Sequence, residues 1–156
     1  MIIYFAGPLF SQAERGFNAY LTAKLENLGF QVFLPQRDGI ELTEALFNEL
    51  SEQELSKKIF NIDRNEILKA DIFLMILDGR GQDEGTCLEL GIAHENKYIN
   101  DQEKLLIGFL TDMRVFSEKF RLNAMLTGAL DCFVDNEIDL FQKIEDFKTR
   151  NKSFKA

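Results

Sequence analysis

The sequence is poor in cysteine, with only Cys87 and Cys132 among its 156 residues, and neither stands in a CxxC or Cys/His arrangement. Zinc sites and disulfide frameworks depend on such spacings, so the sequence predicts neither, and it implies no metal and no other cofactor. Two isolated cysteines suit a reducing compartment. Because the chain also begins with a strand-like run and no basic leader, we expect a cytoplasmic location.

Long hydrophobic runs are absent as well. The most apolar stretch, residues 72–77, is far shorter than the roughly 20 residues that span a bilayer, so no membrane segment is expected. Basic residues are also few, since 26 acidic against 18 basic side chains give a formal charge of -8. Such a surface is poorly suited to a nucleic acid polymer or to anionic lipid, and a small neutral or cationic ligand fits it better.

Apolar residues make up 46% of the chain, enough for one core. We therefore predict a single domain over residues 1–150, with a polar end from residue 149 onward that frays. Strand-like runs are predicted at residues 2–6, 31–34, 72–77, 104–110 and 131–134. Helices are predicted at residues 11–28, 41–70 (two helices, broken near Ser51), 84–96 and 138–147.

This alternation of strands and helices predicts an α/β fold: an open, doubly wound sheet of about five parallel strands with helices on both faces. In such sheets, ligands bind at the carboxyl ends of the strands. Three connections are therefore candidates for the site, at residues 7–11, 78–85 and 111–128.

The connection that follows the most apolar strand gathers carboxylates and glycines where a helix begins. Its glycines match neither GxGxxG nor a phosphate-binding loop, so phosphate cradling is not indicated. Asp83 has a simple explanation as a helix cap. Glu89 lies in an apolar setting, where an ionised carboxylate is costly unless it is paired or functional; a solvated helix face is the alternative.

Two other reactive side chains in this region are not favoured. His94, the only histidine, lies on the same predicted helix and is flanked by Glu95 and Asn96, which is typical of a surface or partly packed residue. Cys87 has no identifiable base nearby, so a packed small side chain is favoured over a nucleophilic thiolate.

Four blocks of this chain resemble the nucleoside 2-deoxyribosyltransferase family, in the family's order and across most of the length. They are Tyr4-Phe5-Ala6-Gly7-Pro8-Leu9-Phe10, then Asp63 eight residues before Asp71, then Asp83-x-Gly85-Thr86-x-x-Glu89-Leu90-Gly91, and finally Asn123-x-Met125. The resemblance implies a flavodoxin-like fold, which agrees with the sheet expected from the strand pattern.

The resemblance also implies chemical roles. Glu89 is similar to the family's nucleophile, which attacks C1' of the deoxyribose and forms a covalent glycosyl-enzyme with retention of configuration. Tyr4 resembles the tyrosine that orients that carboxylate, although a core tyrosine is the alternative. Asp63 resembles the carboxylate at the base, which would exchange a proton with the ring nitrogen and would need a raised pKa.

The implied contacts to the nucleoside involve five further residues. Asp83 resembles the acceptor of hydrogen bonds from sugar hydroxyls, and Asn123 resembles an amide that holds the 5'-hydroxyl from a neighbouring subunit. An aspartate there would repel a 5'-phosphate. Gly7, Phe10 and Met125 lie in the same blocks as further candidates; ordinary packing is the alternative for Phe10 stacking on the base and for Met125.

The expected partners are thus 2'-deoxynucleosides and free purine or pyrimidine bases, and a homo-oligomer with shared active sites. Arg114, Phe116, Phe120 and Arg121 lie in the third connection, which forms a lid or a plain surface crossover. The chain departs from family members that end in an aromatic residue, because it ends in Phe154-Lys155-Ala156.

Two alternative functions remain from the sequence. A 2'-deoxynucleoside 5'-phosphate N-hydrolase would share the tyrosine and the two carboxylates, but phosphate recognition calls for serines, backbone amides or an arginine such as Arg15 or Arg80. A non-enzymatic nucleotide-binding module of flavodoxin-like or receiver type would need paired acids or a Ser/Thr-rich loop after the first strand, where this chain has Gly7-Pro8-Leu9-Phe10.

Overall fold

The computed structural model describes residues 1–40, 49–79, 81–112 and 122–154, with side chains as far as Asn151. The predicted helix over residues 41–48, Arg80 and the candidate lid residues between 113 and 121 lie outside this description. Five parallel strands form one sheet in the order β2-β1-β3-β4-β5. The strands are β1 (Ile2–Ala6), β2 (Gln31–Phe33), β3 (Ile72–Ile76), β4 (Leu105–Phe109) and β5 (Cys132–Val134).

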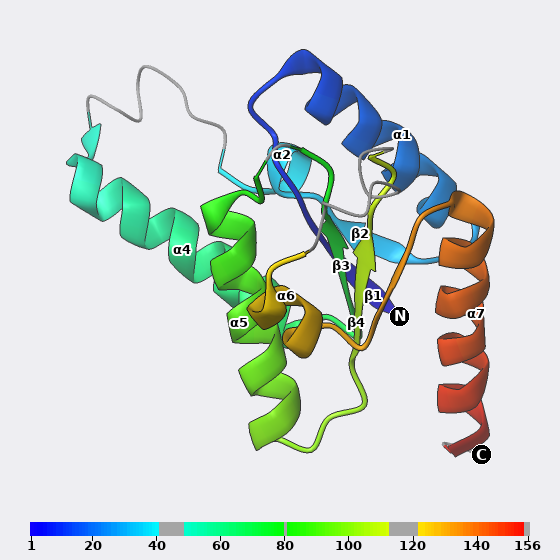
Figure 1. Ribbon diagram of the computed structural model, residues 1–156. Coiled ribbons are helices and arrows are strands. Elements are labelled where there is room, and N and C mark those ends of the chain that lie inside the picture. Colours follow the sequence, from blue (N-terminus) through cyan, green and yellow to red (C-terminus); the bar gives the residue numbers. More distant parts are fainter. Residues whose placement is uncertain (41–48, 80, 113–121, 155–156) are drawn as a thin grey trace.

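Helices cover both faces of the sheet (Figure 1). They are α1 (Gln12–Asn27), α2 (Pro35–Asp38), α4 (Glu52–Lys69), α5 (Glu84–Ile99), α6 (Ala124–Ala129) and α7 (Glu137–Phe154). Helices α1 and α7 lie on one face, and α4 and α5 lie on the other with α6 beside α5. The open, doubly wound parallel sheet predicted from the sequence is therefore confirmed.

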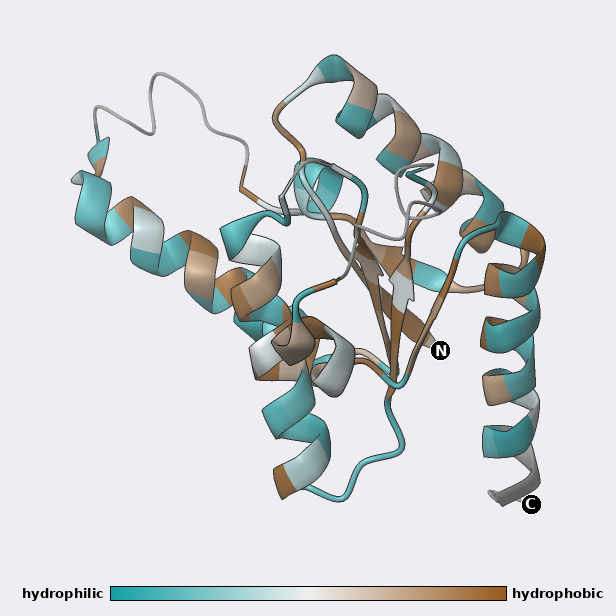
Figure 2. Cartoon of the chain, in the orientation of Figure 1, coloured by the Kyte–Doolittle hydropathy of each residue, from teal (hydrophilic) through white to brown (hydrophobic). Residues whose placement is uncertain are grey.

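Side chains alternate across the sheet and divide the core into two layers. On β1, Ile3 and Phe5 pack with residues of α1 and α7, whereas Tyr4 and Ala6 pack with residues of α4, α5 and α6. This is the alternation expected when both faces of a strand are buried. In Figure 2 the strands are accordingly mostly brown, while the helices carry teal, hydrophilic residues together with brown ones.

Local sequence determines where the main helices begin. Ser11 and Glu14 form a capping box at the start of α1, because each side chain binds the backbone N–H of the other residue. Ser51 and Glu54 do the same for α4, which agrees with the break predicted near Ser51. Asp83 caps α5.

The helices differ from the prediction in three places. Helix α2 follows Leu34 directly with Pro35 in its first turn, and α6 is a short helix within the third connection; neither was predicted. Helix α7 continues to Phe154, so the predicted helix end at residue 147 is wrong. The polar composition of residues 149–154 does not prevent them from extending a helix already anchored by its buried residues.

Among the described residues, no helix is both long and apolar enough to cross a bilayer. The same part of the chain contains no group of three or more His, Cys, Asp or Glu residues that could hold a metal ion.

Close packing at Gly108 in the middle of β4 leads to a first prediction. A Cβ atom there would lie 2.5 Å from Leu77 Cδ1 and 2.9 Å from Leu130 Cδ1. We expect Gly108→Ala to lower the free energy of unfolding in urea by about 1–3 kcal/mol, because both leucines must move. Gly16→Ala, on exposed α1 with nothing within 4 Å, is the matched control and should raise stability by about 0.5–1 kcal/mol. Equal effects at the two positions would contradict the packing described.

Candidate functional site

The centre of the candidate site is a hydrogen bond between β1 and α5. The Tyr4 hydroxyl donates to Glu89 Oε1 at 2.7 Å. Tyr4 is fully buried, and its ring is stacked between Phe33 of β2 and Phe73 of β3, with centroid distances of 5.6 and 5.7 Å. The ring therefore cannot rotate freely, so the hydroxyl points at the carboxylate from a fixed position.

Burial changes the acidity of this pair. The Glu89 carboxyl is desolvated, and the nearby carboxylates of Asp63 and Asp83 add like-charge repulsion, so its pKa is raised from 4.5 to about 7, although the Tyr4 hydrogen bond opposes the shift. Burial together with the charge of Glu89 also raises the pKa of Tyr4, so the phenol stays protonated as a donor. The solvated-face alternative for Glu89 is excluded.

Asp63 lies on α4 and is partly buried. Burial raises the pKa of its carboxyl from 3.8 to about 6. Its charge also contributes to the raised pKa values of Glu89 and Tyr4, which places Asp63 within electrostatic reach of both. A carboxyl with a pKa near 6 can hold or release a proton close to neutral pH.

Asp83 caps helix α5 and also lies within electrostatic reach of Glu89. It is the N-cap of α5: its Oδ2 accepts from the Thr86 N–H at 2.8 Å and from the Thr86 hydroxyl at 2.9 Å. Its charge also reaches Glu89, because it raises the pKa of that carboxyl. Capping of α5 is thus compatible with a position close enough to Glu89 to affect its charge.

The loop after β1 is held by contacts that sequence reasoning missed. Asn18 of α1 is buried and donates from Nδ2 to the Pro8 carbonyl at 3.0 Å. The backbone N–H of Phe10 donates to Glu14 Oε2 at 3.0 Å, while the Phe10 ring is 78% exposed. Ordinary core packing is therefore excluded for Phe10. An isolated asparagine in a helix carries no signal that could have identified this contact in advance.

Gly7 lies where β1 ends against β3. A Cβ atom at Gly7 would lie 3.0 Å from Ile76 Cγ1, so the loop passes close to β3 only because the residue is small. The close contact with Ile76 is enough to explain why residue 7 is a glycine, and no contact to a substrate is needed.

A second contact that the sequence did not reveal joins the other two connections. Asp78, just after β3, accepts from the N–H and the hydroxyl of Thr111, both at 2.5 Å, and from the N–H of Asp112 at 2.9 Å. The connections that follow β3 and β4 are thereby fastened to each other at the carboxyl edge of the sheet.

Asn123 and Met125 lie on the third connection. Asn123 caps the short helix α6, with its Oδ1 accepting from the Met125 N–H at 2.8 Å. Both residues are exposed, and Met125 is 80% exposed. The packing alternative for Met125 is therefore excluded within the protomer, and no hydrogen bond among the described residues joins Asn123 to Tyr4, Asp63 or Glu89.

His94 and Cys87, which the sequence did not favour as reactive residues, have environments that do not suggest catalysis. His94 is partly exposed, and its Nδ1 lies 3.7 Å from Glu95 Oε1. Cys87 is partly buried, and burial raises the pKa of its thiol, which is unfavourable for a nucleophile.

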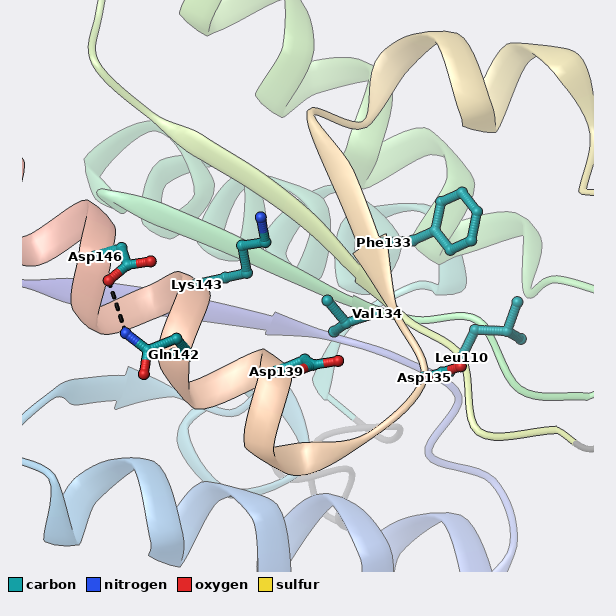
Figure 3. Close-up of a pocket in the computed structure, with 8 residues that line it drawn as sticks. All are labelled: Leu110, Phe133, Val134, Asp135, Asp139, Gln142, Lys143 and Asp146. Atoms are coloured by element: carbon teal, nitrogen blue, oxygen red, sulfur yellow. Dashed lines mark hydrogen bonds between the residues drawn. The ribbon is translucent and has the colours of Figure 1, made fainter.

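A cavity of about 420 Å³ lies elsewhere, between the end of β5 and α7, on the face of the sheet away from α5 (Figure 3). Phe133 and Val134 leave β5 on opposite sides, and the polar side chains come mainly from α7. The lining residues are Leu110, Phe133, Val134, Asp135, Asp139, Gln142, Lys143 and Asp146. None of them belongs to the predicted site.

The raised carboxyl pKa values predict how stability depends on pH. A carboxyl whose pKa is higher in the folded state than in the unfolded state binds more protons when folded, so its contribution is lost as pH rises from about 4 to about 7. We expect Glu89→Gln, which keeps an oxygen for the Tyr4 hydroxyl, to raise the free energy of unfolding by about 1–2 kcal/mol at pH 8 and to change it little at pH 4.

Glu14→Gln is the matched control, because hydrogen bonds from Ser11 and Phe10 lower the pKa of this capping-box carboxyl, so loss of its charge should reduce stability at pH 8. The measurement is urea unfolding of each variant at both pH values. A Glu89→Gln effect of the same size at pH 4 and pH 8 would contradict the raised pKa.

Solved structures of known proteins share this fold. A conserved protein from Enterococcus faecalis V583 is 27% identical, with a TM-score of 0.76, and the alignment covers 96% of this chain and 98% of that chain. A 2-deoxyribosyltransferase from Bacillus psychrosaccharolyticus is 24% identical, with a TM-score of 0.70 and 90% of each chain covered. A CMP N-glycosidase from Clostridium botulinum is 18% identical, with a TM-score of 0.53, covering 93% of this chain and 99% of that chain.

The comparison with curated proteins gave no match. The comparison with protein families is decisive: the nucleoside 2-deoxyribosyltransferase family matches residues 3–145, which include β1 with Tyr4, the helix with Asp63, and the segment from Asp83 to Glu89. The four sequence blocks and the five-stranded parallel sheet agree with this match, and the chain belongs to the nucleoside 2-deoxyribosyltransferase family.

Proposed function

We propose that the protein is a nucleoside 2-deoxyribosyltransferase that moves 2-deoxyribose from one nucleobase to another, with Glu89 as the nucleophile. The observation that carries this proposal is the partly buried Glu89 carboxylate, oriented by the Tyr4 hydroxyl at 2.7 Å and accompanied by Asp63 and Asp83. The family is enzymatic and acts on nucleosides and nucleobases, which supports the same conclusion.

The proposed reaction is a double displacement. An oxygen of the Glu89 carboxylate forms a bond to C1' as the C1'–N bond breaks, and the departing base takes that electron pair and a proton from Asp63. A ring nitrogen of the incoming base then attacks C1', the ester C–O bond breaks, and Asp63 recovers the proton. Two inversions at C1' give net retention.

This mechanism needs Glu89 ionised and Asp63 protonated in the same molecule. The pKa values of about 7 and about 6 lie so close together that the pair holds on average about one proton between pH 6 and 7. Because the pKa of Glu89 is the higher of the two, the form with Glu89 ionised and Asp63 protonated is the less populated one-proton form, and the Tyr4 hydrogen bond raises its population by lowering the pKa of Glu89. The required protonation state is thus accessible near neutral pH.

Asp83 is proposed to accept hydrogen bonds from sugar hydroxyls, and Asn123 to hold the 5'-hydroxyl. With Asp83 at the sugar and Glu89 nearby, a 5'-phosphate would meet like charge in a poorly hydrated space. The proposal therefore favours nucleosides over their 5'-phosphates. Phe10, anchored through its backbone and exposed through its ring, is available to stack on the base.

We also infer a homo-oligomer in which sites are shared. Asn123 and Met125 are exposed at the start of α6, and Leu88 on neighbouring α5 is 58% exposed, so an apolar surface lies beside the site. A second copy that covers it would bring its own Asn123 toward a neighbouring sugar. A cytoplasmic location stays a prediction, and a role in nucleotide salvage would follow from the proposed reaction.

The second candidate function is hydrolysis of the N-glycosidic bond of a 2'-deoxynucleoside 5'-phosphate. The CMP N-glycosidase of similar fold makes it worth testing, and the same nucleophile would serve, with water in place of the incoming base. Arg15 is exposed on the first turns of α1, near the loop after β1, and is the described cation nearest in sequence to that loop. A purely binding module would retain affinity for the nucleoside and show no turnover.

The exchange reaction is the direct test of the proposed function. Incubating the protein with deoxyinosine and free adenine should yield deoxyadenosine and hypoxanthine, followed chromatographically. Glu89→Ala should lower the rate at least about 10³-fold, because the covalent intermediate cannot form. Glu95→Ala is the matched control: it removes an exposed carboxylate from the same helix and should leave the rate within a factor of about two.

A deoxynucleoside 5'-monophosphate should be run in parallel. If the base is released from the monophosphate and no exchange occurs between nucleosides, the protein is the hydrolase and the proposed transferase function is wrong. Binding of deoxyinosine without either reaction would favour the binding module.

The pH dependence of exchange tests the Tyr4 hydrogen bond. Because the mechanism needs Glu89 ionised and Asp63 protonated, kcat/KM should be bell-shaped, with its maximum between pH 6 and 7 in the free enzyme. Tyr4→Phe removes a donor that lowers the pKa of Glu89, so the maximum of kcat/KM should move to higher pH and the rate at pH 6 should fall about tenfold. Tyr98→Phe, at an exposed position on α5, is the control. A lower rate with the maximum at an unchanged pH would contradict this role of Tyr4.

A further inference from the structure

Only one of the two carboxylate oxygens of Asp83 accepts hydrogen bonds from the described residues. Oδ2 accepts both the backbone N–H and the hydroxyl of Thr86, at 2.8 and 2.9 Å. Within the part of the chain that the structure describes, no hydrogen bond to Oδ1 is found. The carboxylate therefore has one oxygen that accepts two hydrogen bonds and one that accepts none from the described residues, and its charge reaches Glu89.

Two neighbours make this orientation specific. Thr86 is only 3% exposed, so its hydroxyl is withdrawn from water and donates to Asp83 alone. Gly85 lies between them, and a Cβ atom there would lie 3.1 Å from Asp83 Oδ2. A larger residue at position 85 would push the carboxylate away from Thr86.

Capping alone does not account for the second hydrogen bond. An N-cap needs only the bond from the backbone N–H, which Thr86 would supply with any side chain. The hydroxyl adds a second donor to the same oxygen, so rotation of the carboxylate would break two hydrogen bonds at once. A carboxylate fixed in this way is preorganised to accept a hydrogen bond through its other oxygen.

We propose that Thr86 is a positioning residue for sugar recognition: its hydroxyl fixes Asp83 so that Oδ1 faces a hydroxyl of the bound 2-deoxyribose, and Gly85 provides the space. The inference rests on the proposed function, and it adds a residue that acts on the substrate through Asp83. It also gives a physical reason for the Asp-x-Gly-Thr spacing in this chain.

The test compares Thr86→Val and Thr86→Ser on three donors: deoxyinosine, its 3'-deoxy analogue and its 5'-deoxy analogue, each with adenine as acceptor. Thr86→Val should lower kcat/KM for deoxyinosine about tenfold, mainly through KM, because the carboxylate loses its fixed orientation. On the analogue that lacks the hydroxyl held by Asp83, the same substitution should cost less than about threefold. Thr86→Ser, which restores the hydroxyl, should return deoxyinosine activity to near the unsubstituted level.

Thr22→Val is the matched control. Thr22 is a buried helical threonine, 1% exposed, whose hydroxyl has no hydrogen-bond partner among the described residues, so its removal should leave all three donors unaffected. A merely structural role of Thr86 would lower activity equally on the three donors.

Equal loss on all three donors, or failure of Thr86→Ser to restore activity, would overturn the inference while exchange by the unsubstituted enzyme upholds the proposed function. Absence of exchange in the unsubstituted enzyme would overturn both. Circular dichroism melting of Thr86→Val at the assay temperature separates loss of folding from loss of orientation: a variant that is folded yet unaffected on deoxyinosine also refutes the inference.

Discussion

Tyr4 and Glu89 are 85 residues apart in sequence and meet in one 2.7 Å hydrogen bond between a central strand and a covering helix. A carboxylate at this depth is costly to ionise, and the phenol hydroxyl compensates part of that cost. The other acids of the site act on the same carboxyl, since both Asp63 and Asp83 raise its pKa. The charge held by this bond is thus set by the Tyr4 hydroxyl together with the two aspartates.

The sheet order makes such a bond possible. β1 lies between β2 and β3, so Tyr4 is flanked by Phe33 and Phe73 at its own register on each side. The right-handed connection after β3 places α5 over the same face, where Glu89 approaches the hydroxyl. The rigidity of the phenol thus comes from strand neighbours, whereas the position of the carboxylate comes from a helix whose first turn Asp83 fixes.

Sequence patterns predicted the features that depend on residue type and period. The apolar runs gave the five strands, and the acids within apolar surroundings pointed to Glu89. What they missed depends on long-range partners: the contacts of Asp78 with Thr111 and of Asn18 with Pro8 join residues whose own neighbours carry no periodic signal. The short helices α2 and α6 were missed because four or six residues cannot show a helical period.

The acidic character of the site matches the acidic character of the whole chain. The chain carries a net charge of -8, and three of its acids are directed into one site, two of them with pKa values raised by burial. Such a concentration of acids weakens the folded state at neutral pH, which is the expected cost of holding reactive groups away from water. The same arrangement disfavours phosphorylated substrates and favours neutral ones, so under the proposed function a single electrostatic feature supplies the nucleophile and selects the nucleoside.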